Sequence, residues 1–430
     1  MTALLFVVGL LALLFAGLHV GTVLFLVGWF GDAFDAQVLP AMLGNISWTT
    51  MNEFLLVAVP LFILLGEILL RSGVADRIYG ALAEWLRWLP GGLLHTNVVA
   101  CALFAATTGS SVATAATIGT VGMPALQKRG YNERLVLGSI AAGGTLGILI
   151  PPSINMIIYG ALTGASVGRL FVAGIIPGIV LTATMVLIIA ITSIWLPDPA
   201  DRHEPVAPLL QRLRGTLDLL PVLFIFLLIM GSIYFGLATP TEAAALGVVG
   251  ALMIAAGRRR LTVTMLHEAF LATVRTTAMV LLVILAAFAL NFVIGFLGIP
   301  QSVASWIEGL GLSAYQTIWL LLVFYLVLGC FLEVVSMMVT TVGIVVPLIV
   351  SLGFDAVWFG VFITILAELA MITPPVGLNL YVVQSIRISR GSIYDVFIGT
   401  LPFAFAMLLV LAVLIYAPEL ALWLPGKMFD

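Results

Sequence analysis

The sequence predicts an all-α polytopic membrane protein, built as an inverted repeat of span, re-entrant hairpin, broken helix and span. Three observations predict it: an extreme apolar composition, two proline pairs in similar apolar segments, and an uneven distribution of Lys and Arg. Of 430 residues, 62% are hydrophobic and 9% are charged, with a mean hydropathy of +1.24. Soluble domains carry about 25% charged residues. Apolar runs exceed the roughly 18 to 20 residues of a spanning helix, and the alternating strands of a membrane barrel are absent.

The apolar runs predict the elements in chain order. The first run lacks the basic segment of a cleaved signal and continues to Phe30, so it predicts a retained helix. Full spans are expected near residues 3–30, 54–70, 135–160, 171–195, 216–236, 242–256, 275–296, 356–383 and 394–417. Residues 93–127 and 316–350 each fit two short arms with small polar residues between them. They predict re-entrant hairpins, whose tips must be solvated by protein or water.

Two proline pairs, Pro151-Pro152 and Pro374-Pro375, interrupt the spans at 135–160 and 356–383. Proline removes an amide donor and clashes with the preceding turn, so each pair predicts a broken helix with free carbonyls. The pairs are 223 positions apart, and the same offset relates three further positions: Pro124 to Pro347, Gly130 to Gly353, and Tyr131 to Phe354. This fixed register predicts a repeat.

The positions of Lys and Arg predict the orientation of the two copies, because these residues concentrate in cytoplasmic loops. Six basic residues flank the first hairpin: Arg71, Arg77, Arg87, Lys128, Arg129 and Arg134. The corresponding segments around the second hairpin, residues 297–315 and 351–355, contain no Lys or Arg. The first hairpin is therefore expected to open to the cytoplasm and the second to the outside, with the N-terminus inside and the C-terminus outside. Copies of opposite orientation can expose one midplane site alternately to each side.

Polar side chains gather at the hairpins and breaks. The first half offers Thr108, Ser110, Ser111, Thr117, Ser153 and Asn155, and the second offers Glu333, Ser336, Thr340, Thr341, Thr373, Gly377 and Asn379. Oxygen ligands of this kind suit hard cations, and half-helix N-termini suit an anion. The alternative for each hydroxyl is a structural one, since Ser and Thr in membrane helices often bond their own backbone.

Two carboxyl groups and one serine motif suggest two other functions, proton coupling and serine hydrolysis. Glu368 in the second broken span and Glu333 at the second hairpin are candidate coupling carboxylates for a proton, or partners in structural pairs. Residues 164–168, with Ser166 at the centre, match the G-x-S-x-G pattern of a serine hydrolase. That motif needs a strand-turn-helix context, which this helical chain does not predict, so no catalytic residue and no enzyme activity are expected. Cys101 and Cys330 are expected to be packing residues.

Three segments together resemble the large membrane subunit of tripartite ATP-independent periplasmic (TRAP) transporters, the DctM-like family: ATTGSSVATAATIGTVGMPALQKRGY (106–131), GILIPPSINMIIYG (147–160) and ITPPVGLNLYV (372–382). The resemblance covers essentially the whole chain. It implies sodium-driven uptake of a small organic acid anion, an elevator-type ion transporter fold, and no cofactor or metal besides sodium. It implies two partners, a periplasmic substrate-binding protein (DctP-like) and a small four-helix membrane subunit (DctQ-like), and no nucleic acid.

The resemblance also implies ligands by position. It places sodium ligands at Gly109, Ser110, Ser111, Pro151, Ser153 and Asn155 in the first half and at Ser336, Thr340, Thr373 and Gly377 in the second. Substrate contacts are expected from Thr108, Thr117, Thr341 and Asn379. The halves are not equivalent, because Ser110 aligns with Glu333 and Asn155 falls one residue out of register with Asn379.

The predicted regions follow from these elements. They are an N-terminal helix and periplasmic loop (1–53), repeat 1 (54–195), a cytoplasmic linker with two connecting helices (196–274), repeat 2 (275–417) and a C-terminal tail (418–430). The expected location is the bacterial inner membrane. A stand-alone divalent anion/sodium symporter, which shares the plan of hairpins and breaks, is the alternative transporter.

Overall fold

The computed structural model describes residues 2–35, 37–195 and 208–429, which form helices and turns with no β-strand among them. This confirms the all-α prediction. In this part of the chain, six helices are long and apolar enough to cross a membrane, or seven if the pair α11 and α12, bent by 42°, is one span. One of the six, Val334–Ser351, lies in the second predicted hairpin. Nine spans were predicted, but two of those were expected to be broken and residues 3–30 form two helices.

Three helices precede the first repeat: α1 Thr2–Phe15, α2 Val20–Asp35 and α3 Leu39–Met51. The prediction of one span over residues 3–30 is therefore wrong. The chain turns at Gly17, where φ is +79°, a conformation that glycine adopts at no steric cost. The predicted loop before residue 54 contains α3. The Asp32 carboxylate fixes its start by accepting hydrogen bonds from the backbone N–H groups of Val38 and Leu39, both at 2.9 Å.

The first half contains η1 Phe54–Val57, α4 Ala58–Arg71, α5 Val74–Leu86, α6 Leu93–Thr108, α7 Ser111–Arg129, α8 Glu133–Thr145, η2 Leu146–Ile148, α9 Ile154–Thr163 and α10 Val167–Trp195. The two arms predicted for the first hairpin are α6 and α7. α6 ends at Gly109, which is left-handed, and α7 begins after Ser110. The first proline pair lies in the break between η2 and α9, as predicted.

Three helices connect the halves: α11 Leu209–Thr216, α12 Leu220–Tyr234 and α13 Pro240–Gly257. The last two are the predicted connecting helices. α13 begins with a capping box, in which the Thr239 hydroxyl accepts from the Glu242 N–H and the Glu242 carboxylate accepts from the Thr239 N–H. Such reciprocal bonds satisfy two amide donors that a helix start leaves free.

The second half contains α14 Val263–Phe296, α15 Ile299–Gly309, α16 Ala314–Gly329, α17 Val334–Ser351, α18 Ala356–Met371, α19 Leu378–Ile386, α20 Ile393–Tyr416 and α21 Glu419–Phe429. Both arms of the second hairpin and the second break lie where they were predicted. Three details differ: α14 begins at Val263 and not near residue 275, α15 was not predicted, and the predicted tail contains α21. α21 is stabilised by packing against α10, which sequence periodicity does not reveal.

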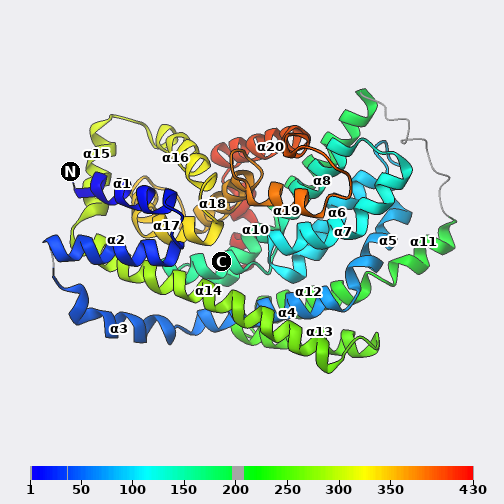
Figure 1. The fold of residues 1–430 in the computed structure, drawn as a ribbon, viewed down its shortest axis with the longest axis horizontal. Helices are drawn as coiled ribbons and strands as arrows, with labels where there is room; N and C mark the ends of the chain where they lie inside the picture. Colours follow the sequence, from blue (N-terminus) through cyan, green and yellow to red (C-terminus); the bar gives the residue numbers. More distant parts are fainter. Residues whose placement is uncertain (1, 36, 196–207, 430) are drawn as a thin grey trace.

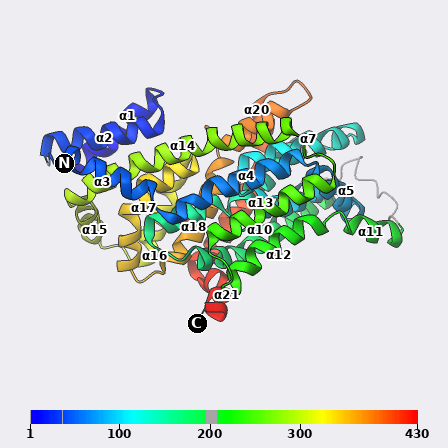
Figure 2. The ribbon, with the colours of Figure 1, turned by 90° about the horizontal axis from the view of Figure 1, so that it is seen from below.

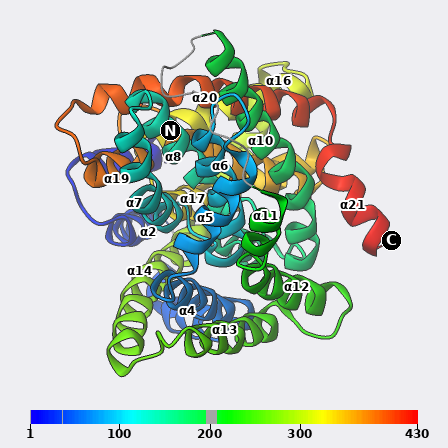
Figure 3. The ribbon, with the colours of Figure 1, turned by 90° about the vertical axis from the view of Figure 1, so that its right-hand side faces the viewer.

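The helices form two layers. α14 runs along one side of the molecule and packs against α2, α3 and α4, and α4 packs against α13 (Figure 1). Seen from below, α4, α13 and α14 cross the molecule together (Figure 2). Figure 3 shows these helices on the opposite side from α8, α19 and α20. The hairpins and broken helices lie mainly in the second layer.

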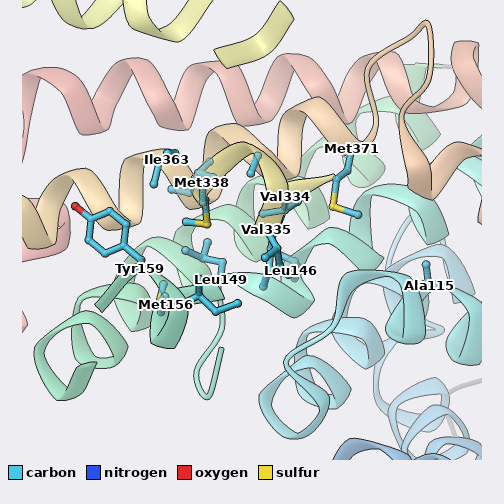
Figure 4. Packing of buried hydrophobic residues seen from close by; sticks show 14 of the residues in the cluster. Ala115, Leu146, Leu149, Met156, Tyr159, Val334, Val335, Met338, Ile363 and Met371 are labelled. Atoms are coloured by element: carbon cyan, nitrogen blue, oxygen red, sulfur yellow. The ribbon is translucent and has the colours of Figure 1, made fainter. Parts of the chain in front are cut away.

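The two halves interlock in this second layer. α9, which follows the first break, packs against α17 of the second hairpin, and α19, which follows the second break, packs against α7 of the first hairpin. Figure 4 shows Leu146 of η2, Leu149 just after it and Met156 of α9. They lie in one hydrophobic cluster with Met338 of α17. The helix after each break therefore packs against the hairpin of the other half.

A cluster of charged side chains joins α8, the residues after α19, and α20 at one end of this layer. The Arg387 guanidinium donates from Nη2 to Glu133 at 2.7 Å and to Asp395 at 3.2 Å, and its Nε donates to Glu133 at 3.0 Å. The Arg387 side chain is only 3% exposed. Its hydrogen bonds lower the pKa of Glu133, and the two carboxylates raise the pKa of Arg387. This charged cluster holds the start of the first half's broken helix to the second half.

Candidate functional site

A cavity of about 430 Å³ lies where both hairpin tips and both helix breaks meet; we call it the central cavity. The first half contributes residues 108–113 and Ala116 of the hairpin and Ile148, Ile154 and Asn155 of the break. The second half contributes residues 333–335 of the hairpin and Met371 and Leu378 of the break. A cavity of this size is within the range of small-molecule sites. Segments from both predicted hairpins and both breaks therefore line one cavity.

The tip of the first hairpin lies directly against the first break. Gly109 has φ of +60°, and a Cβ atom there would lie 2.9 Å from the Pro152 carbonyl oxygen. At Gly147 a Cβ would lie 2.6 Å from the Ser110 carbonyl oxygen. Both approaches require glycine, because any side chain would separate the two segments. The backbone oxygens of tip and break are thus brought close together.

The polar side chains around the first break have two functions. Ser153 is fully buried, caps α9 by accepting from the Met156 N–H, and donates its hydroxyl proton to the Ile148 carbonyl. It fixes the shape of the break without lining the central cavity. Asn155, in the first turn of α9, does line it and is 5% exposed. Its amide can therefore reach a molecule in the cavity.

The second hairpin presents a carboxylate to the central cavity. Glu333 caps α17, and its carboxylate accepts from the Ser336 N–H at 3.3 Å and from the Ser336 hydroxyl at 3.4 Å. Ser336 is therefore behind Glu333 rather than in the cavity wall. The Cys330 thiol lies 3.3 Å from the Pro374 carbonyl oxygen, so this hairpin also touches its own break. Cys101 and Cys330 are both buried and free, as predicted.

At the second break the polar groups are turned away from the cavity wall. Thr373 donates its hydroxyl to the Leu369 carbonyl at 2.7 Å, the local bond that was the structural alternative. Gly377 has φ of +48°, and a Cβ there would lie 3.0 Å from the carbonyl oxygens of both Met371 and Thr373. These carbonyls converge on the start of α19, next to Met371 and Leu378 in the wall.

Asn379 connects the second break to the first hairpin. It is fully buried and donates from Nδ2 to the Ser111 hydroxyl at 2.7 Å and to the Ala141 carbonyl at 3.2 Å. Its Oδ1 has no hydrogen-bond partner in the described part of the chain. Asn379 does not line the central cavity, and its hydrogen bonds hold the two halves together beside it.

Four other predicted ligands lie away from the central cavity. Thr117, Thr340 and Thr341 donate to the carbonyls four residues earlier in their own helices, and Thr341 also accepts from the Tyr325 hydroxyl at 2.8 Å. The Pro151 ring lines a different cavity. The central cavity thus contains Thr108, Gly109, Ser110, Ser111, Asn155 and Glu333 of the predicted set.

Glu368 is fully buried in α18 and is not in the wall of the central cavity. Its carboxyl group lies beside the backbone of Leu149 at the first break. Neither carboxyl oxygen makes a hydrogen bond of good geometry with any described residue. The Glu368 carboxyl group is therefore enclosed by protein without a hydrogen-bond partner among these residues.

Sequence reasoning missed the outer wall of the central cavity, which comes from the other layer. Gly66 and Glu67 of α4 and Thr276 and Met279 of α14 line it. Glu67 forms an ion pair with Arg71, one turn later in α4. The signal that could have found this wall is the carboxylate of Glu67 within an apolar helix.

Charge in the cavity wall comes from Glu67 and Glu333, and no Lys, Arg or His is among the lining residues. The first helical residues of four helices also line the cavity: Ser111 of α7, Ile154 of α9, Val334 of α17 and Leu378 of α19. Helix N-termini carry partial positive charge and free N–H groups. The cavity therefore combines carboxylates that attract cations with helix ends that attract anions.

The serine motif has a structural explanation. The Ser166 hydroxyl accepts from the Arg169 N–H at 3.4 Å, just before α10. The strand that a nucleophile elbow requires does not occur in the described residues. Ser166 therefore lies in the turn that starts a helix.

Comparison with known proteins decides the family. The sequence model of the family described as "Tripartite ATP-independent periplasmic transporter, DctM component" matches residues 6–420. This chain belongs to the DctM family. The relationship favours the three-component transporter over the stand-alone symporter and the protease, and TRAP large permeases work with a small membrane subunit and a periplasmic binding protein.

Two curated relatives are large permeases. The C4-dicarboxylate TRAP transporter large permease protein DctM of Pseudomonas aeruginosa is 34% identical over 379 residues, covering 88% of this chain and 87% of that protein. The sialic acid TRAP transporter large permease protein SiaM of Vibrio cholerae is 32% identical over 431 residues, covering 97% of each. Among solved structures, the Alcanivorax borkumensis YdaH transporter matches with a TM-score of 0.63 at 16% identity, over 92% of this chain and 90% of that one. That last likeness supports the fold alone.

Proposed function

We propose that this TRAP large permease carries out sodium-coupled, secondary active uptake of a small organic acid anion that binds in the central cavity. The observation that carries the proposal is the convergence of four helix N-termini and two carboxylates on one cavity without any basic side chain. The relatives named for C4-dicarboxylate and sialic acid support an organic acid as substrate.

The charge of the cavity wall explains why a cation is needed. An anion about 6 Å from one carboxylate experiences about 3 kcal/mol of repulsion at an effective dielectric constant of about 20. Arg71 already pairs with Glu67, whereas Glu333 has no basic side chain among the residues that line the cavity to offset this repulsion. Sodium ions bound to oxygen atoms at the tips and breaks offset it. In this arrangement substrate and sodium bind together, which is the requirement for coupling.

Sodium ligands are proposed at the tip and break of each half. In the first half the candidates are the backbone oxygens around Gly109 and Pro152, with Ser110 and Asn155 in the cavity wall. In the second half the carbonyls of Met371 and Thr373 converge beside Gly377. Unwound backbone of this kind is a common sodium site in transporters with broken helices.

We further propose that the layer of hairpins and broken helices moves as one body against the layer of α4, α13 and α14. The charged cluster around Arg387 and the hydrogen bonds of Asn379 join the two halves within the moving layer. The central cavity lies between the layers, since α4 and α14 form its outer wall. A shift between layers then exposes the cavity alternately to each side, as an elevator mechanism requires.

The proposal includes the partners and the location. A periplasmic binding protein delivers the anion, and a small membrane subunit binds the permease in the bacterial inner membrane. The C-terminus is periplasmic, as the distribution of Lys and Arg around the two hairpins indicates.

The decisive experiment is uptake by purified permease in proteoliposomes under an imposed sodium gradient. C4-dicarboxylates and sialic acid serve as labelled substrates, with and without the small subunit and the binding protein. We expect uptake only with both partners and with inward sodium. Equal uptake without sodium contradicts the coupling, and full uptake without the partners favours a stand-alone symporter.

The ligand assignment is tested in the same assay. Ser110→Ala and Asn155→Ala are expected to raise the sodium concentration for half-maximal uptake. The control is Ser305→Ala, because Ser305 is exposed on α15 and its hydroxyl only bonds the Gln301 carbonyl. An unchanged sodium dependence in both site variants counts against these ligands.

A proton is the second candidate for the coupling ion, and the buried carboxyl group of Glu368 favours it. Glu368→Gln keeps the shape of the side chain but removes its ability to bind and release a proton near neutral pH. If protons couple transport, this variant abolishes uptake driven by a pH gradient. If sodium alone couples it, the variant keeps its sodium-driven uptake.

A further inference from the structure

A second cavity, of about 610 Å³, reaches the first helix break from another direction; we call it the lateral cavity. Ile150 and Pro151 line it, whereas Ile148 and Ile154 line the central cavity. Its other walls come from α5, α6, α10 and α12. Among the lining residues the only hydrogen-bonding side chain is that of Thr182, which already donates to the Gly178 carbonyl at 2.7 Å. The lateral cavity therefore suits hydrocarbon, because a polar occupant would lose its hydrogen bonds there.

The lateral cavity opens between α10 and α12 toward the surroundings of the spans. Ile179 of α10 and Leu223 of α12 line it, and they are 64% and 48% exposed. α10 is one of the six helices able to cross a membrane. Exposed apolar residues on such a helix face acyl chains in a bilayer. A lipid chain can therefore enter the cavity sideways.

One end of the lateral cavity leads to a cationic group. Arg212 of α11 lies over the Trp85 ring, 5.6 Å from its centroid, and Trp85 follows the lining residue Ile78 by two turns of α5, about 10 Å. Leu219, where the chain leads from α11 into α12, lines the cavity. Nε and one Nη of Arg212 are shielded from solvent and have no hydrogen-bond partner among the described residues. A guanidinium with free donors is a good partner for a phosphate.

In the part of the chain that the structure describes, the acidic residue after α11 and the acidic residue beside Trp85 pair with other arginines. Asp218 pairs with Arg77 at 2.8 Å, and Glu84 pairs with Arg87 at 3.1 Å. α11 exposes three leucines and carries two arginines, and a fourth exposed leucine follows it: Leu209, Leu210 and Leu213 with Arg212 and Arg214, then Leu217. Such a short amphipathic helix fits the boundary between headgroups and acyl chains. The headgroup region therefore lies at the level of Arg212.

We propose that the lateral cavity binds one acyl chain of a glycerophospholipid whose anionic headgroup is held by Arg212. The chain then extends along α12 toward Pro151 and Ala106, behind the first break and beneath the first hairpin tip. The lipid fills the space between α12 and the segment that shapes the candidate ion site. Lipid binding in the lateral cavity does not depend on the proposed transport function, so the lipid proposal and the transport proposal can fail separately.

The test measures lipid retention by the purified full-length protein, using native mass spectrometry after reconstitution with phosphatidylglycerol or phosphatidylethanolamine. We expect the unmodified protein to retain one phosphatidylglycerol in preference to phosphatidylethanolamine. Arg212→Gln removes the charge, and Ala183→Trp fills the cavity from an exposed position of α10. Each is expected to reduce phosphatidylglycerol retention at least tenfold.

Two control variants make the result specific. Arg260→Gln removes the same charge from an exposed position outside the site, and Leu187→Trp places the same ring one turn further along α10, outside the cavity wall. Both are expected to retain the lipid. Retention by Arg212→Gln or by Ala183→Trp overturns the proposal, and so does equal retention of the two lipids. Displacement of the lipid when the small membrane subunit is added overturns it too, because that subunit is then the occupant.

Discussion

The contact between the first hairpin tip and the first break can be tested with a single methyl group. Gly109→Ala places a Cβ atom 2.9 Å from the Pro152 carbonyl oxygen, whereas an ordinary contact needs about 3.4 Å or more. The left-handed conformation of Gly109 also costs alanine about 1 to 2 kcal/mol. Since the opposing atom is backbone and not a flexible side chain, the tip and the break must move apart by about 0.5 Å. Displacements of that size already impair preorganised sites.

Gly130→Ala separates the two effects. Gly130 ends α7 of the same hairpin with φ of +78°, and a Cβ there meets nothing within 4 Å. Both variants are expected to lose about 1 to 2 kcal/mol of folding stability from the backbone conformation. Only Gly109→Ala is expected to raise the sodium concentration for half-maximal uptake, by about tenfold, which corresponds to about 1.4 kcal/mol of binding free energy.

The assay is sodium-dependent uptake in proteoliposomes at equal protein density, with thermal unfolding of both variants recorded in the same detergent. Equal sodium dependence in Gly109→Ala and Gly130→Ala would falsify the claim that this contact shapes an ion site. Loss of uptake in both variants to the same degree would show that hairpin strain, and not the contact, is the cause.

The other predictions concern the joints between the halves. Asn379→Ala leaves the Ala141 carbonyl and the Ser111 hydroxyl without their buried donor. We therefore expect the free energy of unfolding to fall by about 2 to 4 kcal/mol, measured as a lower unfolding temperature. An unchanged unfolding temperature would contradict the stabilising role of these hydrogen bonds. Arg387 lowers the pKa of Glu133 in the folded protein. The ion pair therefore contributes its full stabilisation above the unfolded pKa of about 4.3, and this contribution is lost as the pH falls through the lower folded pKa. Arg387→Gln should flatten this acid-side decrease in unfolding temperature, and parallel curves for the two proteins would contradict it. Replacing both residues of the first proline pair by alanine should restore the helix and abolish uptake while the protein still inserts; retained uptake means the break is dispensable.

The fold was largely predictable where local chemistry dominates. Proline cannot continue a helix, so Pro151 and Pro374 marked both breaks, and glycine and serine at residues 109 and 110 marked the first hairpin tip. The division of the first predicted span into two helices was not predictable from sequence, because Gly17 within an apolar run is compatible with a continuous helix. The helices α3 and α21 were missed for a different reason: each is short and stabilised by contacts with distant helices.

The candidate site was predictable only in part. Composition and proline spacing by themselves determined a helical membrane protein with two breaks and two hairpins. The free-energy cost of leaving backbone groups without hydrogen bonds in lipid, and the interruption of a helix by proline, both depend on the local sequence. Tertiary structure decided which polar groups share a cavity. It placed Asn155 and Glu333 in the wall, turned Thr117 and Thr341 to their own backbone, used Asn379 to join the halves, and added Glu67 from the other layer. Those outcomes depend on how two interlocked halves pack, and side chains on either face of a helix have the same local sequence signature.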